Sequence, residues 1–223
     1  MMTKLIVFDF DGTLADTRAA IIASMQESLR VEGLPVASEE AIAATIGLPL
    51  EAGFRVLCPE IDEESIRRIA FNHRKIFEKN RKLYVPELFP NVKETLAALR
   101  GKGFVLTLAS SRLAASLQRF LVDLGIEEYF SYVLGADSVD KAKPDPEPVL
   151  KTMRELGFSP SETIVVGDMP VDVLMGKRAG AMAVAVTYGN AGVSELEKVA
   201  PDYIIDDISA LVAIACAAGG DAI

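Results

Sequence analysis

The sequence is poor in the residues that bind soft metals and form disulfides. Its 223 residues include one histidine and two cysteines. Cys58 and Cys216 lie far apart in the chain and match no metal-ligand spacing such as C-x-x-C. We therefore expect free thiols in a reducing, cytoplasmic setting.

Long apolar runs are also missing. The N-terminal run over residues 5–8 ends at Asp9, so it is too short for the core of a signal peptide. The C-terminal run over residues 211–218 is too short to span a bilayer. We expect neither a targeting segment nor a membrane partner.

Positive charge is scarce as well. Lysine and arginine total 23 against 32 aspartates and glutamates, which gives a formal net charge of −9 and a pI near 4.8. This balance opposes binding to polyanions, so nucleic acid is not an expected partner. The sequence also has no heptads, internal repeats or G-x-G-x-x-G nucleotide loop.

The remaining composition is that of a folded protein of moderate size. Hydrophobic residues make up 50% of the chain and charged residues 25%. The length exceeds the ~150 residues of an ordinary domain. It fits one enlarged domain or a core with a small insert.

Short apolar runs recur along the chain, and each ends in polar, acidic or glycine residues, as buried parallel strands do. Segments with helical periodicity separate most of them. The alternation predicts an α/β fold, a Rossmann-like doubly wound parallel sheet whose ligands bind beyond the carboxyl ends of the strands. The expected strands are residues 5–8, 104–108, 132–134, 163–166, 182–186 and 203–205, and the expected helices are residues 92–101, 113–124, 146–156 and 171–179.

The connection after the first strand is too long to be a loop. Residues 18–32 have helical spacing, Ser38 begins a helix that ends near Gly47, and Asp62 begins a longer one. We predict an all-helical insert joined to the core by two crossings, which make a natural hinge. The expected ranges are 15–86 for the insert, 14–17 and 82–88 for the crossings, and 1–14 with 87–223 for the core.

Four aspartates lie where the strand ends should converge. Asp9 and Asp11 follow the first strand, and side chains at i and i+2 of an extended backbone point to the same side. Asp168 follows the strand at 163–166, and Asp172 lies where the next helix begins. Four carboxylates around one crevice imply a hard cation, and oxygen-only ligands favour Mg²⁺ over zinc. A turn or a helix N-cap would explain single residues but explains the set poorly.

Two further segments offer groups that bind anions. Ser110 and Ser111 end a strand just before a helix, where hydroxyls and backbone N–H groups form an anion site. Helix capping alone would also account for one serine. Lys143 lies in the segment K-P-D-P-E-P, whose prolines restrict the backbone, although a lysine in isolation is more often a solvated surface charge.

Four motifs, in their order along the chain, resemble those of the haloacid dehalogenase-like hydrolase superfamily. They are D-F-D-G-T-L, the Ser-Ser strand end, K-P-D-P-E-P and G-D-M-P-V-D. The resemblance covers the whole chain, and the insert is similar in position to the helical cap of phosphoglycolate phosphatases and β-phosphoglucomutase. It implies a Mg²⁺-dependent phosphatase of a small phosphorylated metabolite, with phosphoglycolate or a sugar phosphate as candidates, acting as a monomer or homodimer. A phosphomutase is the nearest alternative and a non-catalytic phospho-acceptor switch a remote one.

The same resemblance implies the chemistry. Asp9 would be the nucleophile that becomes an aspartyl-phosphate, and Asp11 the general acid and then the base. The presence of Asp11 argues against a dehalogenase or phosphonatase. Thr13, which completes D-x-D-G-T, is more typical of the phosphatases than of β-phosphoglucomutase.

Binding roles are implied as well. The Mg²⁺ ligands would be Asp9, the backbone carbonyl of Asp11, and Asp168. Asp172 would bind the ion directly or through water, or would orient Lys143. The phosphoryl group would be held by Gly12, Thr13, Ser110, Ser111 and Lys143.

The insert offers candidates for substrate contact without identifying a substrate. Residues 67–82 are rich in lysine and arginine, which either attract phosphate or stabilise the C-terminal half of a helix. His73 falls on an apolar face, where an interior histidine is more common than a catalytic one. The loop at 46–51 with Arg55 is similar to cap segments that meet the substrate. The resulting candidates are Leu48, Arg55 and His73.

Overall fold

The computed structural model describes residues 4–80 and 86–218. In this part of the chain, six parallel strands form the main sheet in the order β5-β4-β1-β6-β7-β8. The strands are β1 (Leu5–Phe8), β4 (Val105–Ala109), β5 (Phe130–Leu134), β6 (Thr163–Gly167), β7 (Met182–Val186) and β8 (Tyr203–Ile205). The predicted α/β sheet is thus confirmed, with strand ends displaced by at most two residues.

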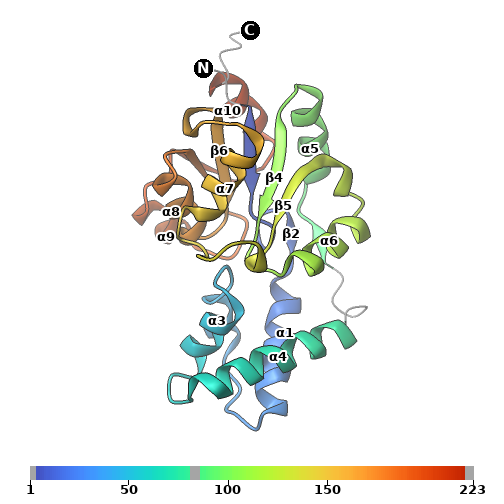
Figure 1. The fold of residues 1–223 in the computed structure, drawn as a ribbon, viewed down its shortest axis with the longest axis vertical. Helices are drawn as coiled ribbons and strands as arrows, with labels where there is room; N and C mark the ends of the chain where they lie inside the picture. Colours follow the sequence, from blue (N-terminus) through green and yellow to red (C-terminus); the bar gives the residue numbers. More distant parts are fainter. Residues whose placement is uncertain (1–3, 81–85, 219–223) are drawn as a thin grey trace.

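Helices cover both faces of this sheet (Figure 1). Strand β1 is fully buried, and its alternate residues Ile6 and Phe8 pack with α5, α6 and α10, whereas Leu5 and Val7 pack with α7 and α8. The core helices are α5 (Val92–Gly101), α6 (Ala114–Asp123), α7 (Glu147–Leu156), α8 (Pro170–Arg178), α9 (Val193–Lys198) and α10 (Ala210–Ala218). Short 3-10 turns lie at Glu127–Tyr129, Ala136–Ser138 and Pro160–Glu162. None of the helices within the described ranges combines the length and apolar character that a membrane span requires.

A helical insert lies beyond the carboxyl ends of the strands (Figure 1). It contains α1 (Arg18–Val31), α2 (Glu39–Ala43), α3 (Leu50–Leu57) and α4 (Glu63–Lys79). These helices bury their own apolar cluster, which includes Met25, Leu29, Phe54 and Ile66. The Ser38 hydroxyl accepts a hydrogen bond from the Ala41 N–H and the Asp62 carboxylate accepts one from the Ser65 N–H, so both residues cap helices as predicted.

The insert differs from the prediction between residues 44 and 57. Helix α2 ends at Ala43, earlier than expected, because residues 44–48 form turns in which Gly47 has a φ of 91°. Pro49 then precedes α3, a helix that the sequence analysis did not predict. The loop before α3 reaches back toward the strand ends.

The insert joins the sheet through a two-stranded antiparallel ribbon. Strand β2 (Ala15–Asp16) leads into the insert and β3 (Glu87–Leu88) leads out of it, with Ala15 opposite Leu88. Of the crossing predicted at 82–88, residues 82–85 lie outside the described residues. The chain therefore enters and leaves the insert through the same ribbon.

Candidate active site

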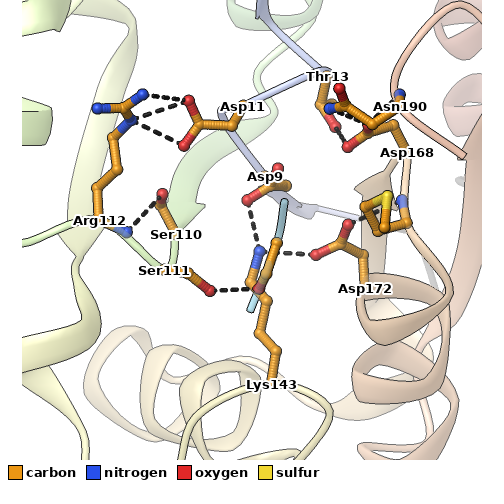
Figure 2. Close-up of polar contacts among 12 residues, drawn as sticks. Asp9, Asp11, Thr13, Ser110, Ser111, Arg112, Lys143, Asp168, Asp172 and Asn190 are labelled. Atoms are coloured by element: carbon orange, nitrogen blue, oxygen red, sulfur yellow. Dashed lines mark hydrogen bonds and ion pairs between the residues drawn. The ribbon is translucent and has the colours of Figure 1, made fainter. Parts of the chain in front are cut away.

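Polar side chains from five parts of the core meet at the carboxyl edge of the sheet (Figure 2). Asp9 follows β1, Ser110 follows β4 and Asp168 follows β6, while Asp172 lies in the first turn of α8. Lys143 comes from the loop before α7. The parallel sheet brings these strand ends together because all its strands end at the same edge.

Three of these side chains form a buried acidic cluster. Asp9, Asp168 and Asp172 each place a carboxylate oxygen within 4.8 Å of the others. Their residues are 3%, 0% and 1% exposed. Such a concentration of buried negative charge requires a cation or protons.

Lys143 supplies part of that positive charge. Its Nζ donates hydrogen bonds to Asp9 Oδ1 at 2.5 Å and to Asp172 Oδ1 at 2.7 Å. Burial opposes the charged ammonium, but Asp172 and Asp9 outweigh it and raise the pKa of Lys143. Lys143 thus stays charged and connects the two carboxylates.

One ammonium does not neutralise the acidic cluster. Burial raises the pKa of Asp168 to about 7, and the nearby charge of Asp172 acts in the same direction. Burial also raises the pKa of Asp9, which Lys143 only partly offsets. Both carboxylates therefore favour a proton or an additional cation.

Surrounding groups fix the orientation of the acids. Asp168 Oδ2 accepts hydrogen bonds from Asn190, through its backbone N–H at 2.7 Å and its side-chain Nδ2 at 2.9 Å. Thr13 Oγ1 donates to Asp168 Oδ1 at 3.2 Å. Asp172 Oδ2 accepts from the backbone N–H of Met169, which caps α8. These contacts preorganise the cluster.

The Asp11 carboxylate is not part of the buried cluster of Asp9, Asp168 and Asp172, which differs from the prediction of four carboxylates around one crevice, although its charge still acts on Asp9. Arg112 Nε lies 2.8 Å from both Asp11 oxygens, and Arg112 Nη2 lies 2.7 Å from Oδ1 (Figure 2). The Thr17 hydroxyl donates to the same Oδ1 at 2.6 Å. The alternation of side chains applies only to an extended strand, and β1 ends at Phe8. Beyond it the chain turns, and the carboxylate of Asp11 points elsewhere.

Gly12 forms that turn. Its N–H already donates to the Ala15 carbonyl at 2.9 Å, and its φ of 85° is in the left-handed region that favours glycine. A Cβ at this position would lie 2.1 Å from Asp168 Oδ2. Gly12 and Thr13 thus lie against Asp168 and help to position it, and their contact with phosphate stays a prediction.

The two serines after β4 have different surroundings. Ser110 is buried, its Oγ accepts from the Arg112 N–H at 3.2 Å, and its hydroxyl proton has no acceptor among the described residues. Ser111 instead donates its hydroxyl proton to the Gly47 carbonyl of the insert at 2.6 Å. Ser110 is therefore the serine that can offer a proton to a phosphoryl oxygen, and Ser111 connects core and insert.

A cavity of about 200 Å³ lies between the insert and the core, next to Asp11, Ser111 and Arg112. Of the candidates in the insert, Leu48 and His73 line this cavity. Arg55 does not, because its exposed guanidinium pairs with Glu63 at 2.7 Å. Arg55 therefore lies outside the lining that Leu48 and His73 share.

Two arginines of the basic run of α4 form ion pairs within the insert. Arg74 contacts Glu51 at 2.7 Å and Arg68 contacts Glu32 at 3.2 Å. Arg81 and Lys82, the end of the predicted run, lie outside the described residues. For Arg68 and Arg74 these pairs favour a structural role over attraction of phosphate.

Arg112 and Asn190 are site residues that the sequence analysis missed. Arg112 directly follows the two serines, so its position beside the strand end was a usable signal. Asn190 lies in a glycine-containing loop that resembles an ordinary turn, and nothing in the sequence connects it with Asp168. Contacts between distant segments revealed both.

Comparisons with known proteins agree with this geometry. Residues 6–186 match the family model described as haloacid dehalogenase-like hydrolase. The chain is 38% identical to probable phosphatase IndB of Dickeya dadantii, over 96% of this chain and 94% of that protein. It is 33% identical to pyrophosphatase PpaX of Oceanobacillus iheyensis, over 96% and 97% of the two chains. The crystal structure of a predicted phosphoglycolate phosphatase from Haemophilus somnus superimposes with a TM-score of 0.88 at 29% identity, covering 96% of this chain and 98% of that one.

Proposed function

The chain belongs to the haloacid dehalogenase-like hydrolases and is a phosphatase, and we propose that it hydrolyses a small phosphorylated metabolite through an aspartyl-phosphate on Asp9, with Mg²⁺ as cofactor. The observation that carries the proposal is the buried cluster of Asp9, Asp168 and Asp172 with Lys143 at the end of the central strands. We further propose that residues 15–86 act as a cap over a core of residues 1–14 and 87–223.

The acidic cluster fits a hard divalent cation. Its three buried members offer only oxygen ligands, and Lys143 balances only part of their charge. Asp9 and Asp168 would hold Mg²⁺ with the backbone carbonyl of Asp11, and Asp172 would complete the site or orient Lys143. When bound, the ion would neutralise charge on the phosphoryl oxygens.

Asp9 suits the role of nucleophile because Lys143 fixes one of its oxygens beside the cluster. In the first step an Asp9 oxygen forms a bond to phosphorus while the bond from phosphorus to the ester oxygen breaks. Lys143 and the Ser110 hydroxyl would donate to the phosphoryl oxygens as charge moves onto them. The product of this step is the acyl phosphate of Asp9.

Asp11 suits the role of acid and base because it lines the cavity where the alcohol would lie. It would give a proton to the ester oxygen that leaves in the first step. In the second step Asp11 takes a proton from a water molecule whose oxygen attacks phosphorus, and the bond from Asp9 to phosphorus breaks. Inorganic phosphate and the starting carboxylate result.

The proposal is tested by phosphate release from p-nitrophenyl phosphate with Mg²⁺. Asp9→Asn should abolish turnover, whereas Asp206→Asn, at an exposed aspartate, should leave it unchanged. Asp11→Asn should turn over slowly while still binding Mg²⁺. A wild-type rate for Asp9→Asn would exclude the nucleophile assignment.

Phosphoglycolate and sugar phosphates remain the candidate substrates, with a phosphomutase as the alternative reaction. Incubation with sugar phosphates, with and without a bisphosphate activator, separates the two reactions. A hydrolase releases inorganic phosphate, and a mutase yields the isomeric sugar phosphate instead.

A further inference from the structure

We propose that the alcohol released by this phosphatase is uncharged and has an apolar body about the size of a six-membered ring. The inference rests on the proposed function, and it uses the cavity between insert and core as the site of the alcohol. It favours phosphate monoesters of uncharged, ring-sized alcohols over phosphoglycolate, whose alcohol has a carboxylate.

The cavity walls are mainly hydrocarbon. Side chains of the insert and of the loop before α6 surround the space from both sides. The larger apolar lining residues are Ile21, Met25, Ile46, Leu48, Pro49, Leu50, Phe77 and Leu113. Walls of this kind stabilise an apolar group by removing it from water.

The charged groups at the cavity are already paired. Among the described residues that line it, three are arginines and three are carboxylates. The pairs are Arg112 with Asp11 at 2.7 Å, Arg74 with Glu51 at 2.7 Å and Arg119 with Glu78 at 3.0 Å. The lining therefore has no excess positive charge toward a bound alcohol.

His73 does not add a positive charge at neutral pH. It is buried against Phe54 and Phe77, and its Nδ1 lies 3.0 Å from the Ser28 hydroxyl. Burial, together with the charges of Arg112 and Arg74, lowers the pKa of His73 to about 4. It faces the cavity as a neutral ring.

The volume also fits a ring better than a two-carbon acid. The cavity measures about 200 Å³. An apolar protein cavity of about 150 Å³ is large enough to bind benzene. A glycolate group would leave much of the space to water, whereas a ring would fill it.

An anionic leaving group would be poorly accommodated. The alcohol of phosphoglycolate has a carboxylate, and the leaving group of pyrophosphate is itself phosphate. Either one would bring negative charge beside Asp11, Glu51 and Glu78, and would have to displace one of them from its arginine. Discrimination against such substrates would come from these carboxylates.

The test compares benzyl phosphate with its para-carboxylate derivative, so that a single charge distinguishes two substrates with the same leaving oxygen. Phosphoglycolate and pyrophosphate are assayed beside them with Mg²⁺. We expect kcat/KM for benzyl phosphate to exceed that for each of the other three by tenfold or more. A preference for any of these three overturns the inference and leaves the phosphatase assignment intact. If none of the four compounds releases phosphate, the proposed function is overturned.

A substitution at Glu51 tests the charge argument directly. Glu51→Gln leaves Arg74 without its carboxylate, so it should raise kcat/KM for the para-carboxylate derivative relative to benzyl phosphate by several-fold. Glu63→Gln is the matched control, because it frees Arg55 in the same insert but away from the cavity lining. An unchanged preference in Glu51→Gln, or an equal change in Glu63→Gln, would overturn the role of the ion pairs.

Discussion

Arg112 binds Asp11 through a forked contact, with Nε and Nη2 both within 2.8 Å of the carboxylate. The guanidinium also lies over the ring of Phe120, 4.8 Å from its centre. Both side chains of the pair are nearly buried. This contact fixes Asp11 toward the cavity and away from the acidic cluster around Lys143.

Arg112→Ala should lower both stability and activity. It leaves a nearly buried carboxylate without its partner, so we expect the free energy of unfolding to fall by about 3 kcal/mol. The rate of phosphate release should fall more than tenfold because Asp11 loses its fixed position. Urea denaturation and a phosphate assay measure the two effects.

Arg55→Ala is the control for that variant. It removes an arginine from an equally close ion pair that is exposed on the insert, so stability and activity should change little. Equal losses in Arg112→Ala and Arg55→Ala would contradict the role given to the Asp11 contact.

Mg²⁺ should stabilise the folded chain by relieving repulsion in the acidic cluster. A ligand at about 100 times its Kd adds about 2.7 kcal/mol. For a chain of this size that amounts to a rise in Tm of several degrees. Asp168→Asn should largely remove the response in a thermal scan, whereas Glu197→Gln, at an exposed residue of α9, should keep it. A full response in Asp168→Asn would exclude this residue as a ligand.

Gly12→Ala should abolish activity while the protein still folds. The new methyl group would collide with Asp168, which the proposed metal site requires. Gly33→Ala separates this effect from backbone strain, because Gly33 also has a positive φ but would place its methyl group in open space. Gly33→Ala should lower the free energy of unfolding by about 1 kcal/mol and keep full activity. Activity in Gly12→Ala equal to that in Gly33→Ala would contradict the prediction.

His73 should make stability depend on pH on the acidic side. Its pKa falls from 6.5 in the unfolded chain to about 4 in the folded one, so between these values the unfolded chain binds more protons. The stability due to neutral His73 is complete above pH 6.5 and is lost as the pH falls toward 4, by up to about 3 kcal/mol.

The measurement is the free energy of unfolding of wild type and His73→Leu from pH 4 to 7. The free energy of unfolding of the wild type, minus that of His73→Leu, should increase as the pH rises. The same pH dependence in both proteins would exclude His73 as the source.

The parts of the fold that follow from local physics were predictable from the sequence. Buried parallel strands are apolar along their whole length, so β1 was identified with its observed ends. Ser38 and Asp62 cap helices by bonds to residues three positions away, and such signals are visible in the sequence. The convergence of Asp9 and Asp168 followed from the parallel sheet.

The remaining features depend on contacts between distant segments. The direction of Asp11 depends on Arg112, about a hundred positions further along the chain. Helix α3 is short and begins at a proline-containing loop, so its pattern was too weak to predict. The pairing of Arg74 with Glu51 joins α4 to α3, and only the folded insert brings the two residues together.

The ribbon of β2 and β3 has a consequence for protein engineering. Because Ala15 lies opposite Leu88, the insert leaves and rejoins the sheet at neighbouring positions. A tight turn between β2 and β3 could replace the insert, or the insert of a relative could be transplanted at the same two strands. If the proposed site and cap are correct, this arrangement separates the reaction centre from an exchangeable module, so that replacing one segment of the gene would change specificity.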